Sequence, residues 1–404
     1  MERTIYREIG LSRGLAGAAA IVALALLAGL IAVVVIEEGG HIVTGMTNQI
    51  VWGTPHIFAI FLIVAASGAL NVASIASVFG RSAYKPLSRL SGLLAIALLV
   101  GGLAVLVLDL GRADRLIVAM TTYNFSSIFA WNIFLYTGFI VVTALYLFVQ
   151  MSRGGARRYV PAAGLLAFLW RLALTTGTGS IFGWLVARPA YDAAIMAPLF
   201  IAMSFSFGLA VFIIVLVTLS RLGNRPLGLG LVTRLARLLA LFVAAVLYFT
   251  AVQHLTNLYA QEHAGIEAFI LRTGGLYTWL FWGGQVILGG LLPMAMIFGS
   301  KNLGIGDAVL ASLFVIAGGF AQLYVIIIGG QAYPLEIFPG FVTSSSFQDG
   351  VVAAYTPSWS EIALGLGGVG IAAALTLLGV KVLRILPTNL GDANLAAQAR
   401  VQSA

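Results

Sequence analysis

Ten apolar stretches, each long enough to cross a lipid bilayer as a helix, dominate this sequence. A hydrocarbon core about 30 Å thick needs roughly 20 apolar residues per helix. The chain has ten such runs, at about 14–36, 55–79, 89–109, 127–150, 160–186, 194–219, 235–258, 275–298, 306–329 and 359–383. Unbroken blocks of Leu, Ala, Val and Ile are typical of helical spans, whereas barrel strands alternate. The sequence therefore predicts an all-α polytopic membrane protein with ten transmembrane helices.

The composition excludes a soluble fold. Only 9% of the 404 residues are charged, whereas ordinary globular proteins have about 25%. The connections between the apolar runs are too short for a soluble domain, so we expect one integral membrane domain over residues 1–404, ending in a flexible cytoplasmic tail over 387–404. Cysteine is absent, so we expect no iron–sulfur cluster held by thiolates in this protein.

Lys and Arg are distributed unevenly between the two sides of the predicted membrane region. With ten spans, 17 of the 22 basic residues fall on the side that carries both termini and four on the opposite side, where ten of the 14 acidic residues lie. Because basic residues concentrate in cytoplasmic loops, we expect a multi-pass protein of a bacterial or archaeal cytoplasmic membrane with both termini cytoplasmic. The net charge of +8 then reflects topology, and we expect no nucleic-acid binding.

Polar side chains inside the predicted spans gather toward the outer half of the membrane. His56 lies near the outer start of the second span, Asp109 at the outer end of the third, and Asn132 near the outer start of the fourth. A polar side chain in hydrocarbon is costly and is by default a functional hypothesis. If these helices pack together, they form a polar cavity that opens toward the outer, acidic face.

A quinol suits such a cavity, because it combines an apolar tail with two oxygens that need hydrogen-bond partners and a proton acceptor. His56 is the natural partner, since imidazole titrates near neutrality and can both donate and accept. Asp109 can orient His56 or receive its proton, so both are candidate catalytic residues. The candidate quinone-binding residues are His56, Asp109, Arg112, Tyr123, Asn132 and Thr176.

Several of these residues also have a structural interpretation. His56 can be an interfacial histidine satisfied by a backbone carbonyl. Asp109 can form an ion-paired loop at the membrane surface with Arg112 and Arg115. Tyr123 can either roof the cavity or anchor the protein at the interface.

Arg171, His254 and Glu262 form a candidate proton path. Arg171 lies about 16 Å along its span at 1.5 Å per residue, and Gln285 and Gln322 are its candidate partners at mid-span. The alternative for Arg171 is a purely structural polar network, and the alternative for Glu262 is solvation at the surface.

Haem is another possibility that the histidines raise. A haem in a helical bundle commonly takes two axial histidines, and only His56 and His254 of the four histidines lie inside predicted spans. One haem at the outer edge is geometrically possible, whereas two stacked haems are excluded by number. We expect neither haem nor a metal site in this protein.

Several segments, taken together, resemble a known family. Trp52-Gly-Thr-Pro-His56, Asp109-Leu-Gly-Arg-Ala-Asp-Arg115 and Tyr123-Asn-Phe-Ser-Ser are similar, in order and spacing, to segments of the NrfD/PsrC family of quinol-interacting membrane subunits. The segments that begin at Thr176, Gly329 and Tyr355 resemble the ten-helix branch that contains HybB and DsrP. The resemblance runs nearly end to end.

The resemblance implies two four-helix bundles, over 55–186 and 194–329, flanked by helices 14–36 and 359–383. It implies a menaquinone or ubiquinone pocket in the first bundle near the outer face. It also implies a docked periplasmic, ferredoxin-like iron–sulfur subunit, other membrane subunits and a multihaem cytochrome c, in an electron-transfer complex of respiration or sulfur metabolism.

By position, His56 falls where the family places a polar quinone ligand, and Asp109 with Arg112 occupies the motif that closes the third span. The sequence departs from the family at one point. Where relatives often carry His or Tyr before the small-residue run of the fifth span, this protein has Thr175 and Thr176. A hydroxyl therefore replaces the ligand expected there.

Two other classes of protein compete with this interpretation. A ten-helix secondary transporter also has polar residues inside its spans and glycine-rich breaks, but it places substrate groups near the midplane. A purely structural anchor would not need His56 and Asp109 at matching depth. The polar residues gather toward one leaflet, which favours the quinone-reactive subunit.

Overall fold

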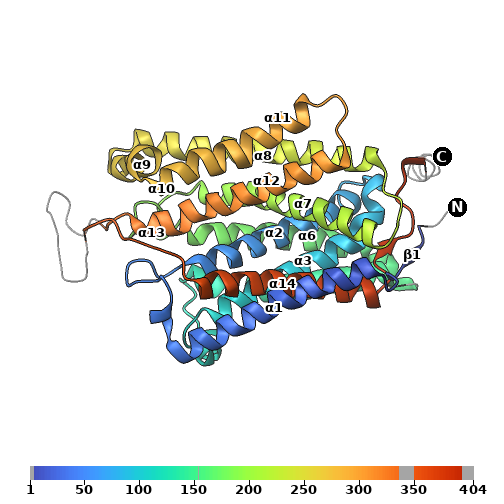
Figure 1. The fold of residues 1–404 in the computed structure, drawn as a ribbon, viewed down its shortest axis with the longest axis horizontal. Helices are drawn as coiled ribbons and strands as arrows, with labels where there is room; N and C mark the ends of the chain where they lie inside the picture. The colour runs from blue at the N-terminus through green and yellow to red at the C-terminus, as the bar shows by residue number, and fades with distance from the viewer. Residues whose placement is uncertain (1–3, 153, 336–349, 394–404) are drawn as a thin grey trace.

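The computed structural model describes residues 4–152, 154–335 and 350–393. Its long helices run side by side along the long axis of the molecule (Figure 1). At one end, strands β1 (Tyr6–Arg7) and β2 (Leu386–Pro387) pair antiparallel, and we call this the terminal end. The opposite end, where α2 begins and α3 ends, is the loop end. Within the described ranges, ten helical segments are long and apolar enough to cross a membrane, which confirms the predicted all-α, ten-span fold.

Some of the ten spans are single α-helices, and others combine α-helical with 3-10 or π-helical segments, which are labelled η. They are α1 (Arg13–Gly39), α2 (Thr54–Ser77), η2 (Ser82–Leu87) with α3 (Ser88–Leu108), α5 (Ile128–Met151), η4 (Gly155–Tyr159) with α6 (Val160–Ile181), α7 (Met196–Leu222), α8 (Leu229–Tyr259), α10 (Leu276–Trp279) with η7 (Leu280–Leu291) and α11 (Leu292–Gly299), α12 (Ile305–Tyr324) with η8 (Val325–Gly329) and α13 (Gly330–Ala332), and α14 (Trp359–Val382). Short elements connect them: η1 (His41–Val43), η3 (Ala113–Arg115), α4 (Leu116–Thr121), η5 (Gln261–His263), α9 (Ala264–Ala268) and η6 (Phe269–Thr273).

The contacts between helices form two groups that share an interface. In the first helix group, α2 packs on α3 and α6, and α5 packs on α3 and α6. In the second helix group, α7 packs on α8 and α12, and the α10–α11 span packs on α8 and α12. Helices α1 and α14 pack on each other, and α14 also packs on α3 and α2. Because α2 packs along α7 as well, the membrane region is continuous, and its division into separate bundles stays a prediction.

Helix α2 occupies the centre of this arrangement. It begins after Gly53 with Thr54 and Pro55, and a proline in the first turn of a helix fits because the missing N–H would have no partner inside the helix. Most of its residues are buried, whereas most of α1 faces outward. A side chain near the start of α2 is therefore held by packing on several sides.

The α2–α7 crossing depends on glycine. A Cβ atom added to Gly68 of α2 would collide with the carbonyl oxygen of Ser204, and one added to Gly208 of α7 would collide with the backbone of Gly68. Small residues at such a crossing let two backbones approach closely, which is a common basis of helix association in lipid.

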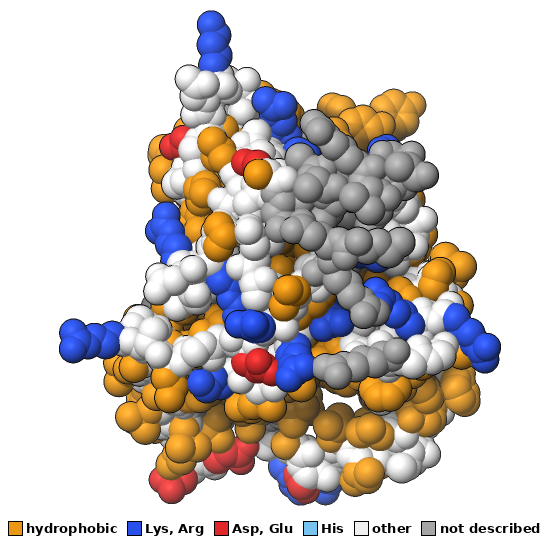
Figure 2. Space-filling view, turned by 90° about the vertical axis from the view of Figure 1, so that its right-hand side faces the viewer, with side chains coloured by type: hydrophobic (Ala, Val, Ile, Leu, Met, Phe, Trp, Pro, Cys, Tyr) orange, Lys and Arg blue, Asp and Glu red, His pale blue; other side chains and the backbone are white. Residues whose placement is uncertain are grey.

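Basic side chains gather at the terminal end of the molecule (Figure 2). Their helices begin or end there: Arg13 opens α1, Arg221 lies in the last turn of α7, and Lys381 lies in the last turn of α14. The asymmetry expected from the loops is thus a property of one end of the folded bundle.

Part of the segment predicted to be a flexible tail is ordered. Arg225 donates hydrogen bonds from Nη1 to the carbonyl oxygens of Leu386 and Pro387, at 2.7 and 3.0 Å. The backbone N–H groups of Gly228 and Leu390 also bond across this junction. The prediction was wrong for residues 387–393, because a polar segment finds partners on the α7–α8 loop. Residues 394–404 lie outside the described residues.

We expect Gly68→Ala to lower the free energy of unfolding by about 1–3 kcal/mol, the usual cost of overpacking a closely packed site. The measurement is the midpoint of thermal unfolding in detergent. Gly17→Ala in α1 is the control, because no atom lies within 4 Å of the carbon it adds. Equal shifts in the two variants would contradict the proposed role of the crossing.

Candidate functional site

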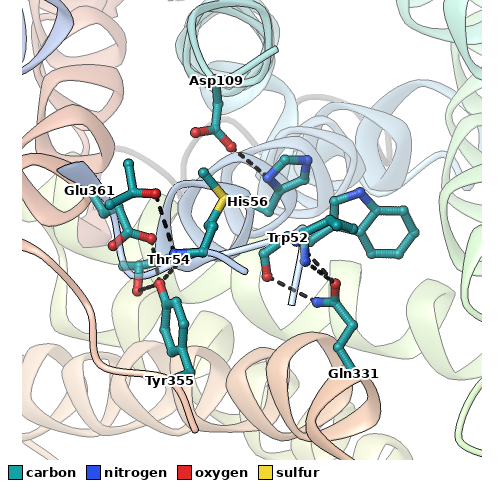
Figure 3. Close-up of polar contacts among 10 residues, drawn as sticks. Trp52, Thr54, His56, Asp109, Gln331, Tyr355 and Glu361 are labelled. Atoms are coloured by element: carbon teal, nitrogen blue, oxygen red, sulfur yellow. Dashed lines mark hydrogen bonds and ion pairs between the residues drawn. The ribbon is translucent and has the colours of Figure 1, made fainter. Parts of the chain in front are cut away.

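The structure brings His56 and Asp109 into contact at the loop end. His56 lies in the first turn of α2, and Asp109 is the residue that caps the C-terminus of α3 (Figure 3). His56 Nδ1 lies 2.7 Å from Asp109 Oδ2, and the side chain of Asp109 is fully buried while that of His56 is 15% exposed. His56 Nε2 has no hydrogen-bond partner among the described residues, so the exposed part of the ring can meet a further group.

This pair is close but incompletely satisfied. Within the described part of the chain, neither His56 Nδ1 nor either carboxylate oxygen of Asp109 makes a hydrogen bond of good geometry. The contact is therefore an ion pair or short polar contact with its N–H poorly aligned. Buried polar atoms nearly always have a directed partner. Here the hydrogen-bonding capacity of three buried atoms is left unused.

Trp52 connects the imidazole to a cluster of aromatic rings. Trp52 stacks on His56, with ring centroids 6.0 Å apart and planes at 25°, and on Tyr191 at 6.2 Å and 25°. Phe129 and Phe182 lie 5.8–6.1 Å from Trp52, Phe182 edge-on. An aromatic cluster with a polar pair beside it is a combination that ligand sites for planar headgroups commonly have.

Gln331 of α13 fixes the backbone of Trp52. Its Oε1 accepts hydrogen bonds from the N–H groups of Val51 and Trp52, each at 3.0 Å, and its Nε2 donates to the carbonyl of Trp52 at 3.0 Å. Arg188 donates to the carbonyl oxygens of Gln331 and Gln49, both at 2.9 Å. The Gly329–Pro334 segment resembles the family, but nothing in the sequence indicated this partner.

A second tether reaches the start of α2 from the segment before α14. The Tyr355 hydroxyl accepts from the N–H of Thr54 at 2.6 Å and donates to Glu361 Oε1 at 2.6 Å. Glu361 Oε2 accepts from the N–H groups of Gly45 and Ser358, both at 2.8 Å. Burial, and then the neighbouring Glu361, raises the pKa of Tyr355, so its hydroxyl keeps the proton that it donates. These contacts hold the turn that carries His56 (Figure 3).

The structure does not bring all the predicted quinone-binding residues to this pair. Arg112 is 66% exposed and bonds to Asp114 at 2.9 Å, and this guanidinium lowers the pKa of Asp114. Tyr123 packs on Phe134 with the rings tilted at 37° and their centroids 4.6 Å apart. Thr176 is exposed on the outside of α6. The expected placement of Arg112 and Thr176 beside the buried pair was wrong, because both side chains face outward.

The side chains of Asn132 on α5 and Thr175 on α6 form contacts between helices. Asn132 Nδ2 donates to the carbonyl oxygens of Ile128 and Gly177, at 2.9 and 3.0 Å. Thr175, one residue before the predicted Thr176, is fully buried and lies 2.6 Å from the hydroxyl of Ser67. Adjacent residues on a helix differ by about 100° in direction. Thr176 therefore faces outward, and the buried hydroxyl is that of its neighbour Thr175.

Arg171 is fully buried, but its partner is not the predicted one. Its Nη2 donates to Asn71 Oδ1 of α2 at 2.8 Å, and its guanidinium lies over the rings of Phe168 and Phe205, 4.9 and 4.8 Å from their centroids. Nε and Nη1 have no hydrogen-bond partner among the described residues.

The glutamines predicted to contact Arg171 bond elsewhere. Gln285 and Gln322 both reach the hydroxyl of Thr250 in α8, at 3.3 and 3.4 Å. The hydrogen bond of Arg171 therefore stays within the first helix group, and those of the two glutamines stay within the second. The prediction of a contact between them was wrong, because equal depth in the membrane does not place two helices side by side.

A second pair of histidine and carboxylate lies at the loop end of the second helix group. His254 Nδ1 is 2.7 Å from Glu267 Oε2, and Asn257 Nδ2 donates to Glu267 Oε1 at 2.9 Å. Glu267 is almost fully buried. The predicted partner, Glu262, is 78% exposed and belongs to the surface.

Two small cavities lie in the second helix group, and His254 of the second pair lines one of them. One is lined by residues that include Gln253, His254, Gln285 and Gln322, and the other shares Gln285 and Gln322 and extends to Ser206. Each has a volume of about 20 Å³. That is room for about one water molecule with polar partners.

The fold and this site define a multi-pass helical membrane protein whose histidine–carboxylate pairs lie at one end of the bundle. The protein belongs to the family described as polysulphide reductase, NrfD, whose model matches residues 42–334. The match extends from the second span to the ninth and includes the site residues His56 and Asp109.

Several named proteins are similar to this protein over most of its length. The Hdr-like menaquinol oxidoreductase integral membrane subunit of Archaeoglobus fulgidus is 30% identical over 85% of this protein and 87% of its own length. A putative dimethyl sulfoxide reductase membrane subunit of Halobacterium salinarum is 27% identical over 94% and 93%. A polysulfide reductase polypeptide of Wolinella succinogenes is 26% identical over 71% and 96%.

We expect Asn71→Leu to lower the free energy of unfolding by about 1.5–3 kcal/mol, because it removes a hydrogen bond to a buried charged group. The double variant Asn71→Leu with Arg171→Met should recover most of this loss, since it also removes the charge. Chemical unfolding in detergent measures both. A neutral Asn71→Leu, or a double variant less stable than the single one, would contradict the pairing.

Proposed function

We propose that this protein is the quinone-reactive membrane subunit of an electron-transfer complex and that His56 and Asp109 form its reactive pair. The observation that carries the proposal is the partly exposed His56, held by a buried carboxylate at 2.7 Å and stacked on Trp52. Family membership supports it, because relatives include a menaquinol oxidoreductase subunit. The substrate is menaquinone or ubiquinone.

The chemistry follows from the two nitrogens of His56. A quinol hydroxyl donates to Nε2, and oxidation of the quinol to the quinone releases two protons and two electrons. His56 takes one proton as a general base, and Asp109 stabilises the imidazolium that results. The two electrons pass to an iron–sulfur partner subunit, and the reverse sequence reduces a quinone. The second proton leaves through water or a second acceptor.

We place the loop end in the periplasm and the terminal end in the cytoplasm, because Lys and Arg gather at the terminal end. The partner is then a periplasmic, ferredoxin-like iron–sulfur subunit, accompanied by further membrane subunits and a multihaem cytochrome c. Large apolar side chains exposed at the loop end around the start of α5 support an interface or a substrate entrance there: Phe125, Trp131, Phe134 and Phe129, which packs on Trp52. Within the family, we assign the protein to the ten-helix branch with HybB and DsrP, in respiration or sulfur metabolism.

We propose that the second pair, His254 and Glu267, contributes a proton path, with Glu267 in place of the predicted Glu262. His254 lines a cavity with room for about one water, and a second such cavity continues from Gln285 and Gln322. We leave Arg171 out of this path, because its hydrogen bond goes to Asn71 and it lines neither of the two cavities.

The alternative of a secondary transporter has less support. Such proteins bind their substrate near the midplane, between broken helices. Here the two histidine–carboxylate pairs lie at the loop end, and the mid-membrane groups Arg171 and Gln285 are engaged by Asn71 and Thr250.

We expect His56→Ala and Asp109→Asn to abolish or strongly reduce quinol oxidation, by about a hundredfold or more, because removal of a general base or its orienting group costs that much. The measurement is turnover with a quinol analogue in the assembled complex. Asp114→Asn, in the same loop, is the control, since Asp114 is an exposed carboxylate paired with Arg112. Normal turnover in His56→Ala with intact assembly would remove His56 from the reaction.

We expect Glu267→Gln to slow proton release coupled to quinol oxidation several-fold, while Glu262→Gln leaves it unchanged. Both substitutions replace a carboxylate with an amide, but only Glu267 is buried against His254. The measurement is the pH change that accompanies turnover in proteoliposomes. Equal effects of the two substitutions would contradict a specific path through Glu267.

A further inference from the structure

A larger cavity lies at the terminal end of the first helix group, away from the reactive pair. Its volume is about 260 Å³. It lies between the end of α2, the starts of α3 and α6, the end of α5 and strand β1. The lining residues that matter below are Tyr6, Lys85, Arg89, Tyr146, Gln150 and Arg157.

The cavity is basic. Three of its lining residues are cations, and none of the described residues that line it is acidic. Arg89 is already engaged, because it donates to the carbonyl oxygens of Arg384 and Gln150 at 2.8 and 3.2 Å and lies over the ring of Tyr6. The side chains of Lys85 and Arg157 have no ion pair or hydrogen bond with any other described residue. Two cations thus face the cavity without a counter-charge.

Two helix N-termini add to this positive potential. The spans of α3 and α6 both begin at the cavity, each through a 3-10 helix (η2 or η4) that continues directly into the α-helix, and no acidic residue lies in these first turns. The N-terminus of a helix carries a partial positive charge and favours anions.

The wall of the cavity is polar as well. The Tyr146 hydroxyl donates to Ser77 at 2.9 Å, and Gln150 Oε1 is buried without a hydrogen-bond partner among the described residues.

The position of the cavity matches the phosphate level of a bilayer. Spans α2 and α5 end beside it at Ser77 and Met151, and α3 and α6 begin beside it. Val160 and Pro161 give it an apolar margin. Phe79, which follows the end of α2, is 58% exposed and packs edge-on against Phe168 of α6. A ligand here meets cations at one end and hydrocarbon at the other.

We infer that this cavity binds the phosphate of an anionic phospholipid headgroup, with Lys85 and Arg157 as its charged partners and the acyl chains outside against α6. Basic pockets between helices at the membrane boundary recognise anionic headgroups by this combination of charge and depth. An inorganic phosphate ion shares the chemistry of the headgroup but not the apolar margin.

The test uses the full-length protein, purified in a neutral detergent and stripped of lipid. Native mass spectrometry measures binding of phosphatidylglycerol, with phosphatidylethanolamine as the zwitterionic comparison. We expect one phosphatidylglycerol to bind in preference and the double variant Lys85→Gln with Arg157→Gln to weaken it about tenfold or more, since each cation near a lipid surface contributes about a factor of five.

The matched control is Arg81→Gln with Arg158→Gln. It removes the same charge from the same two loops, but neither residue lines the cavity. It should retain the bound lipid, as should the charge-keeping variant Lys85→Arg with Arg157→Lys. An unchanged unfolding midpoint establishes that each variant is folded.

Three results would overturn the inference. One is an equal loss in the Arg81 and Arg158 variant, which would mean diffuse attraction. Another is equal binding of the zwitterionic lipid. The third is competition by inorganic phosphate as effective as that of phosphatidylglycerol, which would assign the cavity to a free phosphate ion.

Discussion

A polar group inside a bilayer has no water to bond, so it must find its partner within the protein. This constraint explains much of the packing between helices. The hydroxyl of Ser67 on α2 bonds to α6, that of Ser91 on α3 bonds to the carbonyl of Ala69, and the amide of Asn132 on α5 bonds to the carbonyl of Gly177. Each such bond fixes the depth and the rotation of one helix relative to its neighbour. Contacts between apolar surfaces alone would define neither the depth nor the rotation.

The two histidine–carboxylate pairs satisfy this constraint to different degrees. In the second helix group, Glu267 has a bond to each oxygen, from His254 and from Asn257. In the first, Asp109 is equally buried, yet neither oxygen makes a well-directed bond within the described part of the chain. A saturated pair suits a structural or relay role. An unsaturated pair keeps capacity for a substrate, which is why the reaction is assigned to His56.

Depth could be predicted from the sequence, whereas rotation about each helix could not. His56 and Asp109 were predicted to lie together because they fall at matching depth on consecutive antiparallel spans, and they do lie together. Thr176 was chosen over Thr175, although only Thr175 is buried. A span that is apolar on all sides shows no amphipathic pattern from which to choose a face. For the same reason, the sequence did not show which neighbouring helix Arg171 faces, and Gln285 and Gln322 were wrongly predicted as its partners.

The contacts that hold the reactive turn were beyond sequence reasoning for a further reason. Gln331 bonds to Trp52 and Tyr355 bonds to Thr54, and both partners lie about 300 residues away in the sequence. Gln331 lies in α13 and Tyr355 lies in the segment before α14. The position of His56 therefore depends on how the last two spans pack against the start of α2. An enzyme site built from a single turn would move with that turn. Here two segments distant in the sequence hold the turn, through Gln331 and Tyr355, so that the proposed reactive histidine is held in a defined orientation.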